Sequence, residues 1–358
     1  MKGMSLSEES ASGVARAITG HGRGFEKFAF AAIVGLALVF VILNRGQLPE
    51  AWRAARSAHP EYIALAAGLS VLYLLNIGAI YRAAYRALGL HISYREMLVM
   101  ATAGHFLNMV VANSAGLGGL PLFLHEAKRW GHPRALVTAA YVLVMQLGHL
   151  VFAMVLGIAL ILAWADGEVT RTEWAASVVF AVYTTFSVAA LVAAVTSRAA
   201  TRFIHSLPRR ARRNARRLIR RQLGPFEASH AEADELYDSI HLLVRSPSRL
   251  VLPAALGLLT EVLGIAMVWS LIRAFNAGAS LVDAVIAYAM GVVFGIVGIL
   301  PAGLGFAEAG MGIALTSAGV PGARATLIVV MYRTLEVWVP FAAGAWSAHV
   351  VLRRRDGE

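Results

Sequence analysis

The chain has 358 residues, of which 58% are apolar and 15% are charged, whereas about 25% of the residues in a typical soluble domain are charged. This composition excludes an ordinary soluble protein. The net charge is +11, and the positive-inside rule for membrane proteins accounts for it without a nucleic-acid partner. The absence of cysteine excludes a disulfide, a thiolate nucleophile and a cysteine-ligated metal.

Long runs with no charged residue, or almost none, fill most of the chain. They cover residues 28–44, 62–81, 97–124, 135–165, 175–197, 250–272, 284–323 and 325–352. Most of them reach the roughly 20 residues that a helix needs to cross a bilayer. The sequence therefore predicts an all-α polytopic membrane protein with about six full transmembrane helices.

Two of these runs are interrupted by glycine and proline. Non-helical backbone at membrane depth survives only where protein or water satisfies its hydrogen bonds, so we predict two re-entrant helical hairpins, over residues 97–131 and 284–319. The predicted tips contain Asn113, Gly116 and Gly118 in the first hairpin and Pro301, Gly303 and Gly305 in the second. Close packing between helices is the alternative explanation for the glycines.

The two predicted hairpins share a sequence pattern. The stretch AGLG begins at Ala115 and recurs 187 residues later at Ala302, and a Gly-x-Pro follows in each half, at Gly131 and at Gly319. This pattern predicts an internal duplication. If both termini are cytoplasmic, 25 of the 32 Lys and Arg residues lie inside and six outside, as the positive-inside rule requires. The hairpins then enter from opposite sides, which makes an inverted repeat of the kind found in transporters.

Five segments follow from this topology. They are a cytoplasmic leader (1–27), a first membrane half (28–197), a basic cytoplasmic amphipathic segment (198–249), a second membrane half (250–352) and a cytoplasmic tail (353–358). The arginine-rich segment is expected to lie on the anionic inner leaflet, either as a topology anchor or as a binding surface for headgroups. We expect the protein to be integral to the inner, cytoplasmic membrane.

Ionisable residues within hydrocarbon are costly unless they are paired or hydrated, so each one marks a candidate site. They are Glu261, Glu308, Arg333 and Glu336. The helix that follows the second tip presents unpaired N–H groups, which together with a guanidinium favour a lipid phosphate. Glu308 is then a partner that the phosphate displaces, or a proton acceptor. The alternative is that Glu308, Arg333 and Glu336 form a structural ion pair.

No metal site or cofactor is predicted. His105 and His149 have no histidine or carboxylate partner at metal-ligand spacing, so we expect them to form hydrogen bonds between helices. The sequence has no phosphate-binding Gly-x4-Gly-Lys-Ser/Thr loop, which argues against an intrinsic ATPase.

The second hairpin resembles a known family. The stretch from Gly298 to Glu308 reads GILPAGLGFAE and resembles the Pro-x-Gly-x-Gly-x-x-Glu signature of the lysylphosphatidylglycerol synthase transmembrane family, the flippase-like half of the MprF proteins. Tyr332-Arg333, followed by EVWVP from Glu336, resembles the Tyr-Arg motif and the aromatic-proline helix of that family. Gly118-Gly119-Leu120-Pro121 with Glu126 and Arg129 is similar to its first-half motif.

This resemblance implies a multi-pass protein that moves lipids between leaflets, with Glu308 and Arg333 at the matching positions. No aminoacyltransferase domain is present in the sequence, so we expect no lysine transfer. We therefore predict a flippase or scramblase for an anionic phospholipid or a lipid-linked intermediate. Two alternatives stay open. One is an integral-membrane glycosyl or acyl transferase that uses Glu308 or Glu336 as general base; the other is an accessory subunit of a lipid-synthesis enzyme.

Overall fold

The computed structural model describes residues 53, 55–110, 118–165, 178, 181–182, 185, 246–298 and 301–353. The chain divides into two compact units, Met1–Arg56 and Ser57–Glu358, and all the labelled helices belong to the second. The predicted span 28–44, most of the span 175–197 and the basic segment up to residue 245 lie outside the described residues. The predicted site residues Asn113 and Gly116 lie outside them as well.

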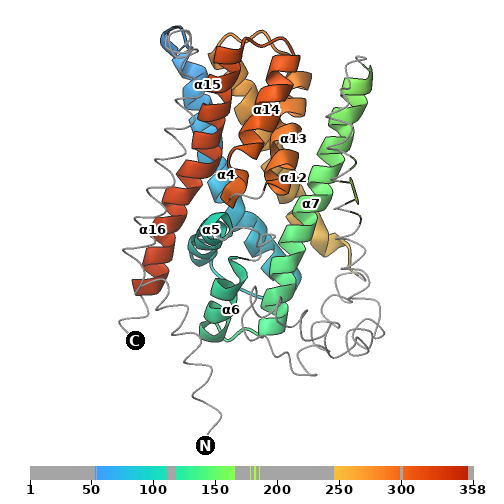
Figure 1. The fold of residues 1–358 in the computed structure, drawn as a ribbon. Coiled ribbons are helices and arrows are strands. Elements are labelled where there is room, and N and C mark those ends of the chain that lie inside the picture. Colours follow the sequence, from blue (N-terminus) through green and yellow to red (C-terminus); the bar gives the residue numbers. More distant parts are fainter. Residues whose placement is uncertain are drawn as a thin grey trace, which may run out of the picture. The chain divides into compact units, whose positions relative to one another are not determined.

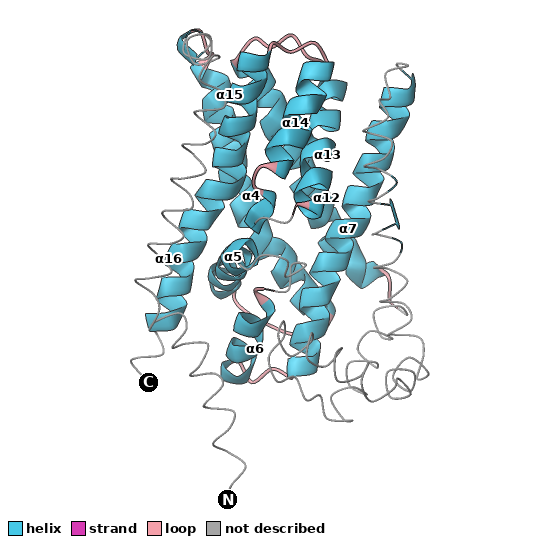
Figure 2. Cartoon of the chain, viewed as in Figure 1, coloured by secondary structure: helices cyan, strands magenta, loops and turns pink. Residues whose placement is uncertain are grey.

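All the regular structure in the described part of the chain is helical (Figure 2), as the sequence predicts. In chain order the elements are α4 (Pro60–Ala87), α5 (Tyr94–Val110), α6 (Leu120–Arg129), α7 (Arg134–Ala165), α12 (Ser248–Ala274), α13 (Leu281–Val297), the 3-10 turn η2 (Pro301–Gly303), α14 (Phe306–Ser317), α15 (Gly322–Arg333), the π-helical turn η3 (Thr334–Trp338) and α16 (Val339–Arg353).

Four segments of the described chain are long and apolar enough to cross a membrane: Pro60–Ala87, Arg134–Ile161, Ser248–Ala274 and Gly322–Ser347. Each coincides with a run that the sequence predicts to be transmembrane. Large apolar side chains on these helices are exposed, among them Val251 (66%), Ile161 (66%) and Trp164 (78%). Lipid is the solvent that such a surface requires, so the chain is a polytopic membrane protein.

The helices pack into two adjoining cores around the pair α4 and α12, which contact each other most extensively. One core lies among α4, α5, α6 and α7, and the other mainly among α12, α13, α14 and α15. The pair α5 and α6 lies toward one end of the unit, and the pair α13 and α14 lies toward the other (Figure 1). The turn η2 therefore faces inward, where α5 packs against it.

The helices of the two cores begin at matching positions along the chain. The element α12 begins 188 residues after α4, α13 begins 187 after α5, α14 begins 186 after α6, and α15 begins 188 after α7. Local geometry matches as well. Positive φ angles occur at Gly89 and again 187 residues later at Asn276. The serine before α5 and the serine before α13, Ser93 and Ser280, both cap the third residue of the helix that follows.

Candidate functional site

The turn between α13 and α14 brings the backbone into conformations that favour glycine. Ala302, Gly303 and Gly305 have φ angles of +54°, +64° and +83°. Gly303 also lies so close to α13 that a Cβ atom on it would come within 2.5 Å of the Cα atom of Gly295. Only glycine satisfies both conditions at position 303. The predicted break in the helix is therefore present: α13 ends at Val297, and the turn η2 begins at Pro301.

The start of α14 is capped by its own acidic residue. Glu308 is the third residue of α14, and its Oε2 atom accepts a hydrogen bond of 2.6 Å from the backbone N–H of Gly305. A carboxylate at a helix N-terminus interacts favourably with the partial positive charge of the exposed amides. The N-terminal position that the sequence assigns to a lipid phosphate is thus occupied by the carboxylate of Glu308.

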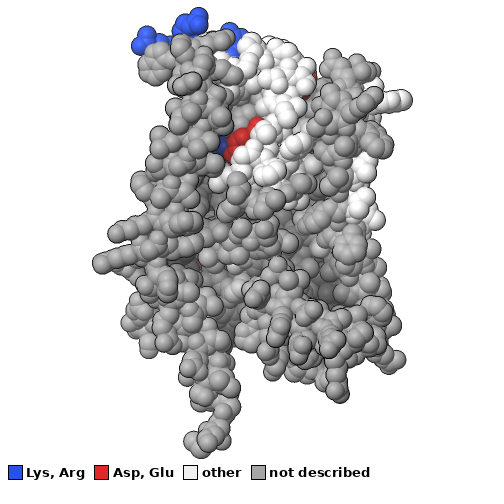
Figure 3. Space-filling view, in the orientation of Figure 1, with Lys and Arg blue, Asp and Glu red and all other residues white. Residues whose placement is uncertain are grey.

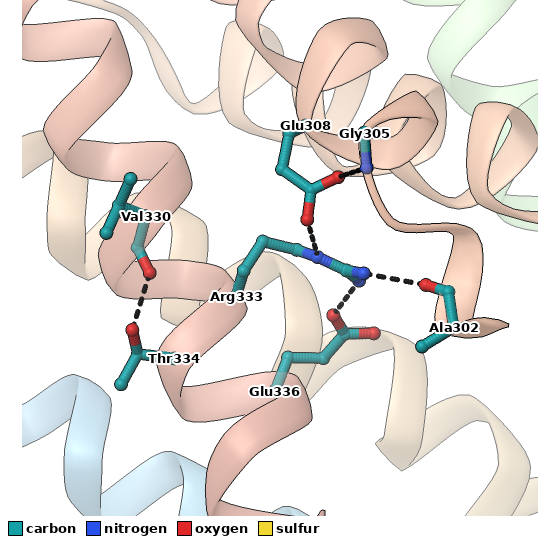
Figure 4. A network of polar contacts seen from close by, with 7 residues as sticks. All are labelled: Ala302, Gly305, Glu308, Val330, Arg333, Thr334 and Glu336. Atoms are coloured by element: carbon teal, nitrogen blue, oxygen red, sulfur yellow. Dashed lines mark hydrogen bonds and ion pairs between the residues drawn. The ribbon is translucent and has the colours of Figure 1, made fainter. Parts of the chain in front are cut away.

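Arg333, the last residue of α15, joins this turn to the helix beside it (Figure 4). Its Nε atom donates to Oε1 of Glu308 at 2.8 Å, and one terminal nitrogen donates to Oε2 of Glu336 at 2.7 Å. The other terminal nitrogen donates to the carbonyl of Ala302 at 2.7 Å. All three nitrogens of the guanidinium are therefore in use. We call Glu308, Arg333, Glu336 and the Ala302 carbonyl the Arg333 cluster.

The π-helical turn η3 follows Arg333 directly, and Pro340 explains why the helix widens there. Proline has no N–H, and its ring clashes with the carbonyl four residues earlier. The N–H of Val339 bonds to the carbonyl of Thr334, five residues back, which leaves the carbonyl of Leu335 without its α-helical donor. That carbonyl instead accepts a 2.6 Å hydrogen bond from the hydroxyl of Ser70 on α4. Single π turns of this kind often mark functional sites.

The Arg333 cluster is mostly buried but opens at one side. The side chains of Arg333, Glu308 and Glu336 are 10%, 18% and 24% exposed. Figure 3 shows acidic side chains, with basic atoms beside them, at the surface in the region of α14, bordered by uncharged residues. Phe306 and Ile313 on α14 are 38% and 45% exposed. The charged groups therefore open onto an apolar surface.

Glu261, the fourth predicted ionisable residue, lies apart from the three that form the cluster. It is 8% exposed on α12, and its Oε2 atom accepts a 2.7 Å hydrogen bond from the hydroxyl of Tyr288 on α13. The structure thus brings three of the four ionisable residues into direct contact and leaves the fourth with a neutral partner.

Neutral groups form the hydrogen bonds between the end of α5 and the start of α6 in the first hairpin. Asn108 on α5 accepts a hydrogen bond from the N–H of Gly119 at 2.7 Å and donates one to the hydroxyl of Tyr141 at 2.9 Å. Gly118, the one predicted residue of this tip that the structure describes, lies two residues before α6 begins. Within the described residues, no group of three or more His, Asp or Glu side chains has a spacing that suits a metal ion.

Several groups at the site were not predicted from the sequence. The carbonyl of Ala302 and the N–H of Gly305 are backbone groups, and no side chain signals that they point toward Arg333. Ser70 is 265 residues away from its partner Leu335 along the chain. The signal available for it was a polar residue inside an apolar run, which is common among membrane helices. His105, predicted to form a hydrogen bond between helices, has a buried Nε2 atom with no such partner in the described part of the chain.

Comparison with known proteins agrees with these features. Residues 28–344 match the family described as the lysylphosphatidylglycerol synthase TM region. The chain is also similar to a UPF0104 membrane protein of Methanothermobacter thermautotrophicus, with 24% identity over 326 residues, which cover 87% of this chain and 91% of that protein. The matched region includes both hairpins and the whole Arg333 cluster.

Proposed function

Because the chain belongs to the lysylphosphatidylglycerol synthase transmembrane family, we propose that it is a translocase that moves a lipid between the two leaflets of a membrane. The observation that carries the proposal is the Arg333 cluster. A guanidinium and two carboxylates lie beside an unwound turn and open onto an apolar surface. A lipid headgroup needs such polar groups inside, while its acyl chains need an apolar surface outside.

The proposed substrate is an anionic phospholipid or a lipid-linked intermediate with a phosphate. Glu308 bridges the N–H of Gly305 and the Nε atom of Arg333, and a phosphate oxygen suits the same two donors. We infer that the phosphate displaces the carboxylate of Glu308 from these donors during transport. Glu308 returns when the lipid leaves, so the buried guanidinium always keeps a partner.

The matching helix starts support an inverted repeat. In the first half α4 is followed by the pair α5 and α6 and then by α7, and in the second half α12 is followed by the pair α13 and α14 and then by α15. The contacts inside the pairs also correspond, because a Cβ atom on Gly104 would meet Phe123 and one on Gly291 would meet Met311. We propose that both pairs are re-entrant hairpins and that they expose one central site alternately to the two sides.

The orientation and the location are part of the same proposal. The distribution of Lys and Arg favours cytoplasmic termini in an inner membrane. In this orientation the Gly319 turn between α14 and α15 lies outside and the Gly131 turn between α6 and α7 lies inside. An engineered cysteine at each turn, tested with a thiol reagent that does not cross membranes, measures this directly, since the natural chain has no cysteine.

Leaflet exchange of a fluorescent phosphatidylglycerol in proteoliposomes tests the proposed activity. Arg333→Ala is expected to slow exchange roughly tenfold or more, because charge-assisted hydrogen bonds contribute about 1.5–3 kcal/mol. Glu308→Gln is expected to slow exchange while lipid binding is retained, because the amide competes poorly with the bound phosphate. Arg324→Ala is the matched control, since this arginine lies on the same helix but bonds to the exposed carbonyl of Asn276.

Two outcomes would contradict the proposed transport role of the Arg333 cluster. Normal exchange by both Arg333→Ala and Glu308→Gln would leave the cluster as a structural ion pair and would refute the proposed mechanism. Covalently altered lipid after incubation with the wild-type protein would instead identify a transferase. Elution of each variant as a single species in mild detergent is the check that folding is intact.

A further inference from the structure

A second acidic residue, Glu261, is buried on α12 outside the Arg333 cluster. Glu261 is 8% exposed and its carboxylate accepts a hydrogen bond from Tyr288. The ring of Tyr288 is fixed against α12 at Gly264, where a Cβ atom would come within 2.4 Å of it. The small residue therefore lets the tyrosine approach α12 and direct its hydroxyl to Glu261 three residues earlier, on the same face of the helix.

The hydrogen-bond partner of Glu261, the hydroxyl of Tyr288, is neutral. Within the described residues, Arg333 forms its ion pairs with Glu308 and Glu336, and no ion pair joins Glu261 to a cation. A buried carboxylate with only a neutral donor is costly to keep ionised, because neither water nor a counter-charge stabilises it. The same carboxyl group in its protonated form carries no such cost.

Glu261 interacts electrostatically with ionisable side chains, one of which belongs to the cluster. The groups that interact electrostatically with it include Tyr73 on α4, Tyr288 on α13, Tyr332 on α15 and Glu336 in η3. The rings of Tyr288 and Tyr332 are in edge-to-face contact, with 6.4 Å between their centroids. Tyr332 is the residue directly before Arg333. The helix α7 also packs against α12, and the ionisable residues on its apolar stretch are Tyr141 and His149.

We propose that Glu261 binds a proton reversibly and that this proton sets the affinity of the Arg333 cluster for an anionic headgroup, with Tyr288 positioning the carboxyl group. This inference rests on the proposed function. The cluster has one guanidinium and two carboxylates, a formal charge of −1, and an ionised Glu261 adds a further negative charge nearby. Addition of a proton to the carboxylate removes that charge, so an anionic lipid binds better at low pH and leaves more readily at high pH.

Leaflet exchange of fluorescent phosphatidylglycerol, measured between about pH 5 and about pH 8, tests the inference, because a proton on Glu261 changes the charge beside the cluster. Exchange by the wild-type protein is expected to depend on pH. Glu261→Gln, which keeps a neutral side chain of the same size, is expected to give a flat profile. Tyr288→Phe is expected to retain the pH dependence with a shifted midpoint. Glu96→Gln is the control, because this carboxylate is exposed and bonded to Ser93.

A second measurement separates this inference from the proposed function. Infrared difference spectra of the purified protein between the two pH limits are expected to show a protonated carboxyl band that is missing in Glu261→Gln. If the band is missing in Glu261→Gln but this variant keeps the pH dependence of the wild type, the coupling is refuted. If the band is unchanged in Glu261→Gln, Glu261 is not the proton site. Absence of lipid exchange by the wild type at every pH would refute the proposed function, whereas the infrared band would still report on Glu261.

Discussion

The hydrogen bond from Ser70 to the carbonyl of Leu335 provides a sharp test of how the π turn is held in place. Ser70 is 1% exposed and Leu335 is 8% exposed, so water does not reach the pair. The α-helical donor for this carbonyl, the N–H of Val339, bonds to Thr334 instead. The π-helical donor is position 340, a proline, which has no N–H. Ser70→Ala therefore leaves a buried acceptor without a partner.

The expected loss of stability is about 1–3 kcal/mol, the cost of an unsatisfied buried polar group. Ser270→Ala is the matched control. Ser270 is 3% exposed on α12, and its hydroxyl bonds to the carbonyl of Ala266, which is four residues earlier in the same helix and needs no second donor. Both substitutions remove one buried hydroxyl from a helix interior, so they share the loss of packing and the gain in helix propensity.

Equilibrium unfolding in mixed micelles of mild detergent and sodium dodecyl sulfate measures both free energies. The free energy of unfolding of Ser70→Ala is expected to be lower than that of Ser270→Ala by about 1–3 kcal/mol. Equal values for the two variants would show that the carbonyl of Leu335 finds another donor. That result would remove the argument that Ser70 fixes the π turn and, through it, the position of Glu336 beside Arg333.

Two further predictions concern glycines that lie at close contacts. Gly303→Ala is expected to abolish lipid exchange, because position 303 combines a positive φ with a clash against α13. The control is Gly319→Ala. Gly319 has a φ of +80° but open space around it, so this substitution introduces backbone strain without a clash. Gly344→Ala is expected to destabilise the protein by about 1–3 kcal/mol, because a Cβ atom there would come within 2.5 Å of Phe106 on α5. Gly312→Ala on α14, with nothing within 4 Å, is expected to be neutral or slightly stabilising in the same unfolding assay.

The helices and the charged cluster were predictable from the sequence because strong physical costs govern them. Uncharged runs of membrane length become helices, since no other structure satisfies the backbone in lipid. Arg333 and Glu336 are three residues apart and both needed a partner in an apolar setting, so their contact follows from helix geometry. Glu308 was expected near the start of a helix, and it is the third residue of α14.

The finer geometry was not predictable, because it depends on backbone groups that carry no sequence signal. The sequence indicates that the helix breaks at Pro301, but it does not show that the carbonyl of Ala302 turns toward Arg333. The sequence also led us to expect free amides at the start of α14, whereas the N–H of Gly305 donates to the carboxylate of Glu308. A glutamate at the third position of a helix was the available signal for that self-capping. The number of spans and the depth of both hairpins stay predictions.

The contacts of Arg333 have a mechanical consequence for any movement of α13 and α14. One rigid, planar group holds the start of α14, the inside of the η2 turn and the neighbouring η3 segment at the same time. Because two of these bonds reach the turn and the start of α14, the turn cannot move away from α15 without breaking them. A molecule that competes for the guanidinium therefore loosens the contact of both segments with α15 at once.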